Sequence, residues 1–291
     1  MSKKVIPALI ALVLALVWLS LSFVSFPVFA IIVGILAAIG VYEVEKSLGV
    51  TNKVFMAITL IFTAVGPVLT HFNGQFTIPT TALLCVYIIA ILTMLVIRHE
   101  TMEFKATAAS TLISICLQYG FSCIVYLRDI YKLDANVFEG KKSYGMFFLL
   151  FAFFCSWMTD AMAFFAGSFF GKHKMHPKIS PNKTIEGAIG GVAGNALLSL
   201  VLLAVFRHFF DIKVGFIFTA CVAVVLSVIS IFGDLAASVV KRQNGIKDFG
   251  NLIPGTGGIM DRFDSCLFVM PLLYSIISVL NQYDAIDLIF Y

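Results

Sequence analysis

Nine apolar segments of about twenty residues follow one another along the chain, and they limit its fold more than any other feature. They cover residues 5–23, 26–43, 54–71, 78–97, 106–127, 145–170, 185–206, 214–240 and 263–281. A helix needs about twenty apolar residues to cross the hydrocarbon core of a bilayer. Helices are expected because lipid offers no partners to backbone N–H and C=O groups. The pattern predicts an all-α, polytopic integral membrane protein with about nine transmembrane helices.

Charge is scarce along the whole chain, which excludes an ordinary soluble domain. Only 12% of the 291 residues are charged and 60% are hydrophobic, whereas soluble domains average about 25% charged residues. The first apolar run follows Met-Ser-Lys-Lys and resembles the start of a signal peptide. This run is long enough to span and lacks a small-residue cleavage site, so we expect a retained first helix.

Lysine and arginine are distributed unevenly between the predicted connections. With the N-terminus in the cytoplasm, nine spans place fourteen of these residues on the inner side and six on the outer side. This agrees with the positive-inside rule. We therefore expect a multi-pass protein of the cell (plasma) membrane, with the connections 171–186 and 241–262 in the cytoplasm, where nucleotides are found.

The two halves of the chain differ in chemistry. Residues 1–143, with about five spans, show no group of residues that indicates a reaction, and we interpret Glu43, Glu45 and Lys46 as a solvated helix end. Residues 144–291, with about four spans, contain acids, bases and glycines within and between the apolar runs. Ionisable groups in or beside a bilayer are costly and are commonly functional. We therefore expect an N-terminal transmembrane region followed by a C-terminal catalytic region.

The segment 233–265 places acids, bases and glycines close together between two apolar runs, and it reads GDLAASVVKRQNGIKDFGNLIPGTGGIMDRFDS. Asp234, Asp261 and Asp264 have no cysteine or histidine beside them, and such carboxylates suit a hard cation such as Mg2+. Lysine and arginine neutralise phosphate charge, and glycines let backbone N–H groups approach phosphate oxygens. Asp261 and Asp264 would share one face if they were helical. The combination indicates metal-assisted phosphoryl or nucleotidyl transfer.

Two polar elements precede this segment. Asp160 lies inside the sixth apolar run, where an acid must face the bundle interior or a wet cavity; a single polar contact between helices is the other interpretation. Residues 180–187, SPNKTIEG, offer donors to an anion at the start of a helix, although helix capping alone explains the same residues. Glycines at close-packing spacing then predict tight contact of the seventh helix with the sixth or eighth: Gly187, Gly190, Gly191 and Gly194.

Taken together, these strings resemble the signature of the CDP-diacylglycerol synthase (phosphatidate cytidylyltransferase) family. The resemblance rests on SPNKTIEG, Ser238-Val-Val-Lys241-Arg242, Lys247-Asp248, Pro254-Gly-Thr-Gly-Gly258 and Asp261-Arg262-Phe-Asp264. Thr256 stands where the family usually has histidine. The resemblance is strong over 145–281 and rests on hydropathy before it. It implies the conversion of CTP and phosphatidate to CDP-diacylglycerol and pyrophosphate in phospholipid biosynthesis, Mg2+ with the number of ions open, and a homodimer.

The resemblance and the residue chemistry together assign roles to individual residues. Asp234 and Asp261 are expected to bind Mg2+, with Asp264 as a further ligand. Lys241 is expected to act with them in catalysis. The expected substrate-binding residues are Asp160, Ser180, Lys183, Thr184, Glu186, Ser238, Arg242, Lys247, Asp248, Gly257, Gly258 and Arg262. A phosphate monoester is already ionised, so no strong general base is required.

Other functions remain open on the sequence alone. A CTP-dependent kinase of a polyprenol or phytol-like alcohol, or a cytidylyltransferase of ether lipids, would also join a nucleotide to a membrane lipid. A hydroxyl substrate would need a base such as Asp160, Asp248 or Asp264. A transporter with Asp160 and Asp234 as a relay would require inverted repeats or paired broken helices, which the sequence lacks. A basic, aromatic nucleic-acid surface is also missing, so nucleic acid is not an expected partner.

Overall fold

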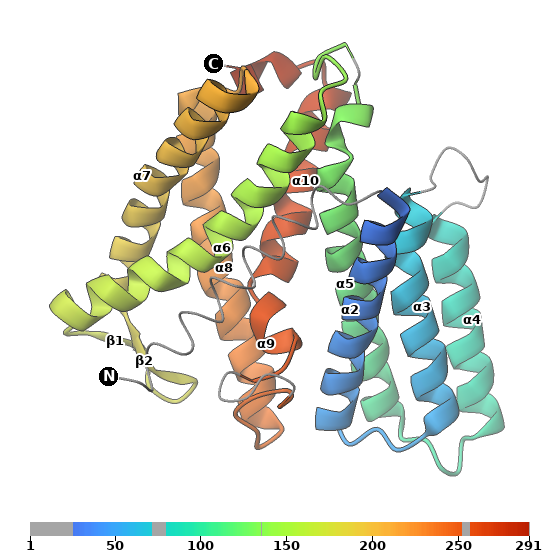
Figure 1. Cartoon of the computed structure of the whole chain (residues 1–291). Coiled ribbons are helices and arrows are strands. Elements are labelled where there is room, and N and C mark those ends of the chain that lie inside the picture. Colours follow the sequence, from blue (N-terminus) through green and yellow to red (C-terminus); the bar gives the residue numbers. More distant parts are fainter. Residues whose placement is uncertain (1–25, 72–79, 135, 252–256, 291) are drawn as a thin grey trace. The chain divides into compact units, whose positions relative to one another are not determined.

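The computed structural model describes residues 26–71, 80–134, 136–251 and 257–290, and most of these residues are helical (Figure 1). Seven of the described helices are long and apolar enough to cross a membrane. The predicted all-α, polytopic membrane protein is therefore confirmed, but the count of nine spans is not. The predicted first span, 5–23, lies outside the described residues, and the helix at the predicted ninth span has 17 residues.

Chain contacts divide the described helices into two compact units. The first unit contains the described residues up to 125 together with those of 244–263, and the second contains those of 126–243 and 264–290. The segment that carries the glycines therefore packs with the N-terminal helices. The functional boundary expected between 143 and 144 was drawn from chemistry rather than from contacts, and it stays a prediction.

The first unit is a group of helices held mainly by apolar packing. It contains α2 (Phe26–Ser47), α3 (Lys53–His71), α4 (Thr80–Ile97), most of α5 (Phe104–Arg128) and the short α9 (Met260–Phe263). Phe62 of α3 stacks on Tyr87 of α4 with ring centroids 3.8 Å apart. The Tyr87 hydroxyl forms a 2.5 Å hydrogen bond with the hydroxyl of Ser114 on α5. This pairing satisfies two polar groups that would be costly to bury alone.

The second unit is organised around the close packing of two long helices. It contains η1 (Ile130–Lys132), α6 (Lys142–Phe170), β1 (Lys174–His176), β2 (Ser180–Thr184), α7 (Ile185–Phe210), α8 (Phe216–Gln243), α10 (Cys266–Gln282) and η2 (Ile286–Phe290). A Cβ on Gly191 of α7 would lie 2.9 Å from the Ala163 Cβ and from the Thr159 carbonyl oxygen of α6. Small residues allow this approach, as the glycine spacing predicts.

The connection between α6 and α7 is not the plain loop that the sequence predicts. Its two strands form an antiparallel hairpin in which Lys174 pairs with Thr184 and His176 with Ser180. Pro181 lacks the N–H that a ladder requires, which confines it to an edge strand. The hairpin ends directly at the first turn of α7, and it therefore fixes Lys183 and Thr184 at that helix start (Figure 1).

The predicted ninth span also begins differently. The structure ends α9 at Phe263 and starts α10 at Cys266, so the expectation that Asp261 and Asp264 share a helix face is wrong. The Asp264 carboxylate accepts the N–H of Ser265 at 2.8 Å. Such a local bond offers the backbone an alternative to helical pairing. The break places the two acids in different compact units.

Candidate active site

A cavity of about 630 Å3 lies in the second unit, bounded by α6, α7, α8 and the β1–β2 hairpin. Five of the residues named from the sequence line it: Asp160 of α6, Ser180, Lys183 and Thr184 of β2, and Asp234 of α8. The sequence places them in three separate stretches, and the packing of α7 against α6 brings them to one cavity. Polar groups converging in a cavity of this size are typical of a small-molecule site.

Glycines that line the cavity let α6 and α7 pack closely beside it. Gly167, Gly171 and Gly187 all line it. A Cβ on Gly167 would lie 2.8 Å from Thr184 Oγ1, and one on Gly187 would lie 2.8 Å from the Ala163 carbonyl oxygen. Thr184 Oγ1 accepts the N–H of Gly187 at 3.1 Å and thereby caps α7. Side chains larger than glycine would therefore separate the two helices and disturb the cap.

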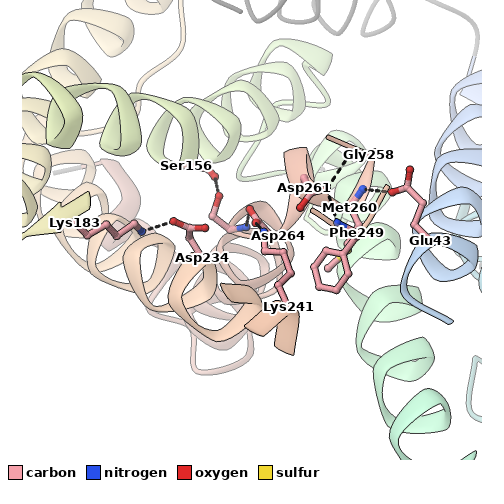
Figure 2. A network of polar contacts seen from close by, with 11 residues as sticks. Glu43, Ser156, Lys183, Asp234, Lys241, Phe249, Gly258, Met260, Asp261 and Asp264 are labelled. Carbon is pink, nitrogen blue, oxygen red and sulfur yellow. Dashed lines mark hydrogen bonds and ion pairs between the residues drawn. The ribbon is translucent and has the colours of Figure 1, made fainter. Parts of the chain in front are cut away.

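The charges of this region are strongly interdependent. Asp234 forms an ion pair with Lys183 (Figure 2). Asp160, Asp234 and Asp264 lie within electrostatic range of one another. Like charges repel strongly where water is scarce, so a group of three acids requires cations nearby. Lys183 and Lys241 supply part of that charge through their ion pairs.

Lys241 lies on the buried face of α8, near the end of this helix, and it pairs with Asp264. Its ammonium donates to Asp264 Oδ2 at 3.3 Å, and the two residues are only 8% and 6% exposed. Burying either charge without the other would be costly. The next residue, Ser265, is anchored by a 2.6 Å hydrogen bond with the Ser156 hydroxyl of α6 (Figure 2). The break before α10 is therefore held from both α8 and α6.

Three further residues named from the sequence lie elsewhere in the second unit. Arg242 donates from Nε to the Ile179 carbonyl oxygen at 3.4 Å, which links α8 to the hairpin. Glu186 accepts the backbone N–H of His173 and forms a 2.6 Å bond with its ring Nδ1. Both side chains therefore support the hairpin. Ser238 is half-buried on α8.

The remaining residues named from the sequence belong to the first unit: Lys247, Asp248, Gly257, Gly258, Asp261 and Arg262. Asp261 Oδ2 accepts the N–H of Phe249 at 2.8 Å and that of Gly258 at 3.0 Å (Figure 2). Lys247 and Asp248 are exposed. Thr256 lies outside the described residues. We expected the glycines to bring backbone N–H groups to phosphate oxygens, but the N–H of Gly258 is bound by a carboxylate of the chain itself.

The interpretation of Glu43 and Glu45 as part of a solvated helix end is wrong. They are 6% and 1% exposed, and α2 continues beyond them. Glu45 accepts the Ser110 hydroxyl at 2.6 Å. Glu43 accepts the N–H of Ile259 at 3.1 Å and that of Met260 at 2.9 Å. The sequence did contain a signal for this burial: two acids stand at the end of an apolar run, and acids in or beside a membrane need polar partners.

The donor chemistry of the second unit fits Mg2+. Its interacting acids offer oxygen ligands, which this cation prefers. Among the described residues, no group of three His, Cys, Asp or Glu side chains is close enough to hold an ion unaided. Mg2+ commonly uses only one or two carboxylates and fills its other positions with waters and substrate phosphates. Asp234, which lines the cavity, and Asp264, which interacts electrostatically with Asp234, are the two carboxylates available for that smaller requirement.

Comparison with known proteins gives independent information. A model described as the cytidylyltransferase family matches residues 3–280. Phosphatidate cytidylyltransferase of Bacillus subtilis is 37% identical over 194 residues, which are 67% of this chain and 66% of that protein. The proteins of that name from Staphylococcus haemolyticus and Staphylococcus epidermidis are 44% and 46% identical over 136 residues, 47% of this chain and 51% of each relative. The chain thus spans about two thirds of the first relative's length and about half of the other two.

Proposed function

This chain belongs to the cytidylyltransferase family, and from that premise we propose that it makes CDP-diacylglycerol and pyrophosphate from CTP and phosphatidate. The names of the similar bacterial proteins support this reaction. The observation that carries the proposal is the cavity of the second unit, where Asp160, Lys183 and Asp234 converge. A transfer between two polyanions needs cations to offset their charge and acids that can hold a metal ion, and this cavity is lined by two lysines and two carboxylates that support such a role.

The surroundings of the cavity suit an amphiphilic substrate. A second cavity of about 660 Å3, bounded by α7, α8 and the hairpin, is lined mainly by apolar residues. It shares the lining residues Met175, Ala188 and Ile231 with the polar cavity, so the two cavities are adjacent. An acyl chain in the apolar cavity would place its phosphate headgroup beside Lys183.

In the proposed reaction, an oxygen of the phosphatidate phosphate attacks the α-phosphorus of CTP. The new bond joins these two phosphates. The bond that breaks runs from the α-phosphorus to the oxygen bridging to the β-phosphate, and that oxygen leaves with pyrophosphate. No proton has to be removed from the ionised nucleophile, so positioning and charge compensation carry the catalysis. Lys183 would hold a phosphate oxygen as a point charge.

We further propose Mg2+ as the cofactor. Asp234 and Asp264 would bind it in the second unit. Asp261, which was expected from the sequence to bind Mg2+ together with Asp234, lies in the first unit and stays a predicted ligand. When bound, Mg2+ would neutralise charge on the triphosphate and on the departing pyrophosphate. Asp160 lies close enough to Asp234 to interact with its charge, and it would thereby help to set the affinity for the cation.

The direct test is product formation by the purified protein. Incubation with labelled CTP, phosphatidate and Mg2+ in detergent should yield CDP-diacylglycerol and pyrophosphate. Asp234→Asn should lower turnover by at least about 100-fold, because losing a direct ligand should cost more than losing a partner behind one, which costs about 10- to 100-fold. The elution volume in gel filtration should not change. Replacing phosphatidate with diacylglycerol or a polyprenol tests the alternative function, a CTP-dependent lipid kinase. Phosphorylated lipid in place of a CDP-lipid would overturn the proposal.

The cellular setting is proposed on the same grounds. We propose the cell membrane as the location, with the N-terminus and the connections 171–186 and 241–262 in the cytoplasm. The positive charge of these connections and the cytoplasmic supply of CTP support this orientation. A homodimer is proposed from the family resemblance. Native mass spectrometry of the detergent-solubilised protein tests it, and a single-chain mass would contradict it.

A further inference from the structure

We infer that Glu43 of α2 is a positioning residue that holds the turn carrying Asp261 in its active shape. This inference rests on the proposed function, because it assigns to Glu43 a role in the same reaction. Glu43 lies in a part of the chain to which the sequence assigned little chemistry. Its contacts, however, are made with the signature segment rather than with water.

The carboxylate of Glu43 makes two separate backbone contacts. Oε1 accepts the N–H of Ile259 at 3.1 Å. Oε2 accepts the N–H of Met260 at 2.9 Å, and Figure 2 shows this second contact. The side chain is 6% exposed. Each oxygen therefore serves one N–H at the start of α9, where the first N–H groups have no partner within the helix.

Asp261 binds the same turn through its own carboxylate. It accepts the N–H of Gly258 at 3.0 Å and that of Phe249 at 2.8 Å. Three consecutive N–H groups, those of 258, 259 and 260, thus donate to two carboxylates. Any movement of the turn that frees Glu43 also changes the backbone from which the Asp261 side chain extends.

The glycines of the segment are explained by Glu43. A Cβ added at Gly250 or at Gly258 would overlap the Glu43 carboxylate. Both positions therefore need glycine in order to admit this acid, quite apart from any phosphate. Gly257 is different, because its φ of 91° requires the conformation that glycine adopts readily.

The test compares Glu43→Gln with the matched control Glu45→Gln. A glutamine side chain has one oxygen acceptor and one NH2 donor. In Glu43→Gln, one of the two backbone N–H groups, that of Ile259 or that of Met260, would therefore face a donor instead of an acceptor. Glu45 is a buried acid on the same helix, but it binds Ser110 and not the turn. The Mg2+ concentration for half-maximal CDP-diacylglycerol formation should rise about 10-fold in Glu43→Gln, as loss of a partner behind a metal ligand commonly causes. Glu45→Gln should leave it unchanged.

Backbone hydrogen exchange provides a readout that does not depend on activity. Amide exchange in a peptide covering 257–263 should accelerate in Glu43→Gln and not in Glu45→Gln. Faster exchange with an unchanged Mg2+ requirement would reduce Glu43 to a structural contact and overturn the inference. Unchanged exchange would overturn it as well. If the wild-type protein made no CDP-lipid, the proposed function would fail instead, and that outcome is visible without any variant.

A double-mutant cycle adds a second, independent criterion. Gly250→Ala should raise the Mg2+ requirement in the wild-type background, because its methyl group displaces the Glu43 carboxylate. The same change should have little further effect in Glu43→Ala, where the obstructed side chain is gone. Interaction of this kind is expected only for residues in contact. Additive effects in the cycle would contradict the inference.

Discussion

Lys241 and Asp264 show how burial changes the role of a charged residue. From the sequence, Lys241 was a candidate phosphate ligand near a membrane surface. In the structure it is buried and paired with Asp264 at 3.3 Å. The energetic consequence is asymmetric, because removing one member of a buried pair leaves an uncompensated charge, whereas replacing both can be nearly neutral.

This asymmetry gives a prediction for Lys241→Met. The single variant should lower the free energy of unfolding by about 3 kcal/mol, because Asp264 stays buried without its cation. Adding Asp264→Asn should restore much of that loss. Thermal unfolding of the two variants in the same detergent checks this. Equal or greater destabilisation in the double variant would show that the ion pair does not control stability here.

Individual residues were predictable from the sequence where their surroundings were local. Asp160 and Asp234 stood out because an acid in or beside an apolar run needs a reason. Lys183 stood out as a donor at a predicted helix start, and all three line one cavity. Glu43 could not be placed in the same way. Its partners lie 216 and 217 residues further along the chain, and no local pattern contains that information.

At the scale of elements, the contact of α6 with α7 depends on glycines. Gly191→Val should destabilise the protein by about 3 kcal/mol, at the upper end for overpacking, because the added Cβ would lie 2.9 Å from a backbone oxygen of Thr159. The matched control is Ala204→Val, an exposed position on the same helix. Thermal unfolding should separate the two variants clearly. Similar melting temperatures would mean that the helices can separate at little cost.

A second element-scale prediction concerns the connection that precedes α6. Bonds from Lys141 and Lys213 lower the pKa of the exposed Glu139 carboxyl from 4.5 to about 2. A depressed folded-state pKa means that ionised Glu139 stabilises the fold above the unfolded-state pKa. That contribution disappears as the pH falls toward the folded-state pKa. Glu139→Gln should therefore lower the melting temperature at pH 7, and the difference from wild type should shrink between about pH 4.5 and about pH 2.

A difference in melting temperature that is independent of pH would assign the effect of Glu139→Gln to packing instead. Raising the salt concentration provides a control, since exposed ion pairs are screened by salt.

The elements themselves were largely predictable, because each apolar run is long enough to form a helix whatever its neighbours are. The exceptions are the β1–β2 hairpin and the break between α9 and α10. The hairpin depends on strand pairing within a polar connection. The break depends on the Asp264–Ser265 bond and on the Ser156 anchor. Each is decided by a few hydrogen bonds that hydropathy does not report.

At the scale of the whole molecule, the most important untested prediction is the orientation of the chain in the membrane. α6 has 29 residues and is therefore about 43 Å long, more than the roughly 30 Å of a hydrocarbon core. Asn136 precedes this helix, and Lys178 lies in the hairpin that follows it. The two positions should therefore lie on opposite sides of the membrane.

Single cysteines at these two positions test the orientation. In a cysteine-free background, an impermeant maleimide should label Asn136→Cys in intact cells, and it should label Lys178→Cys only in inverted vesicles. This outcome places the hairpin and its cavity in the cytoplasm, beside the supply of CTP. The reverse pattern would contradict the proposed orientation, and labelling of both positions from one side would contradict a membrane-spanning α6.

The contact between Glu43 and the start of α9 also bears on how the protein is made. Ile259 and Met260 lie 216 and 217 residues after Glu43 in the chain, so they leave the ribosome much later than Glu43 does. A contact between such distant parts of a chain is slow to form, because a very long loop must close first. The turn around Asp261 can therefore acquire its shape only after the 217 residues that follow Glu43 have been made, and every shorter nascent chain carries an acid that has not yet met its partners.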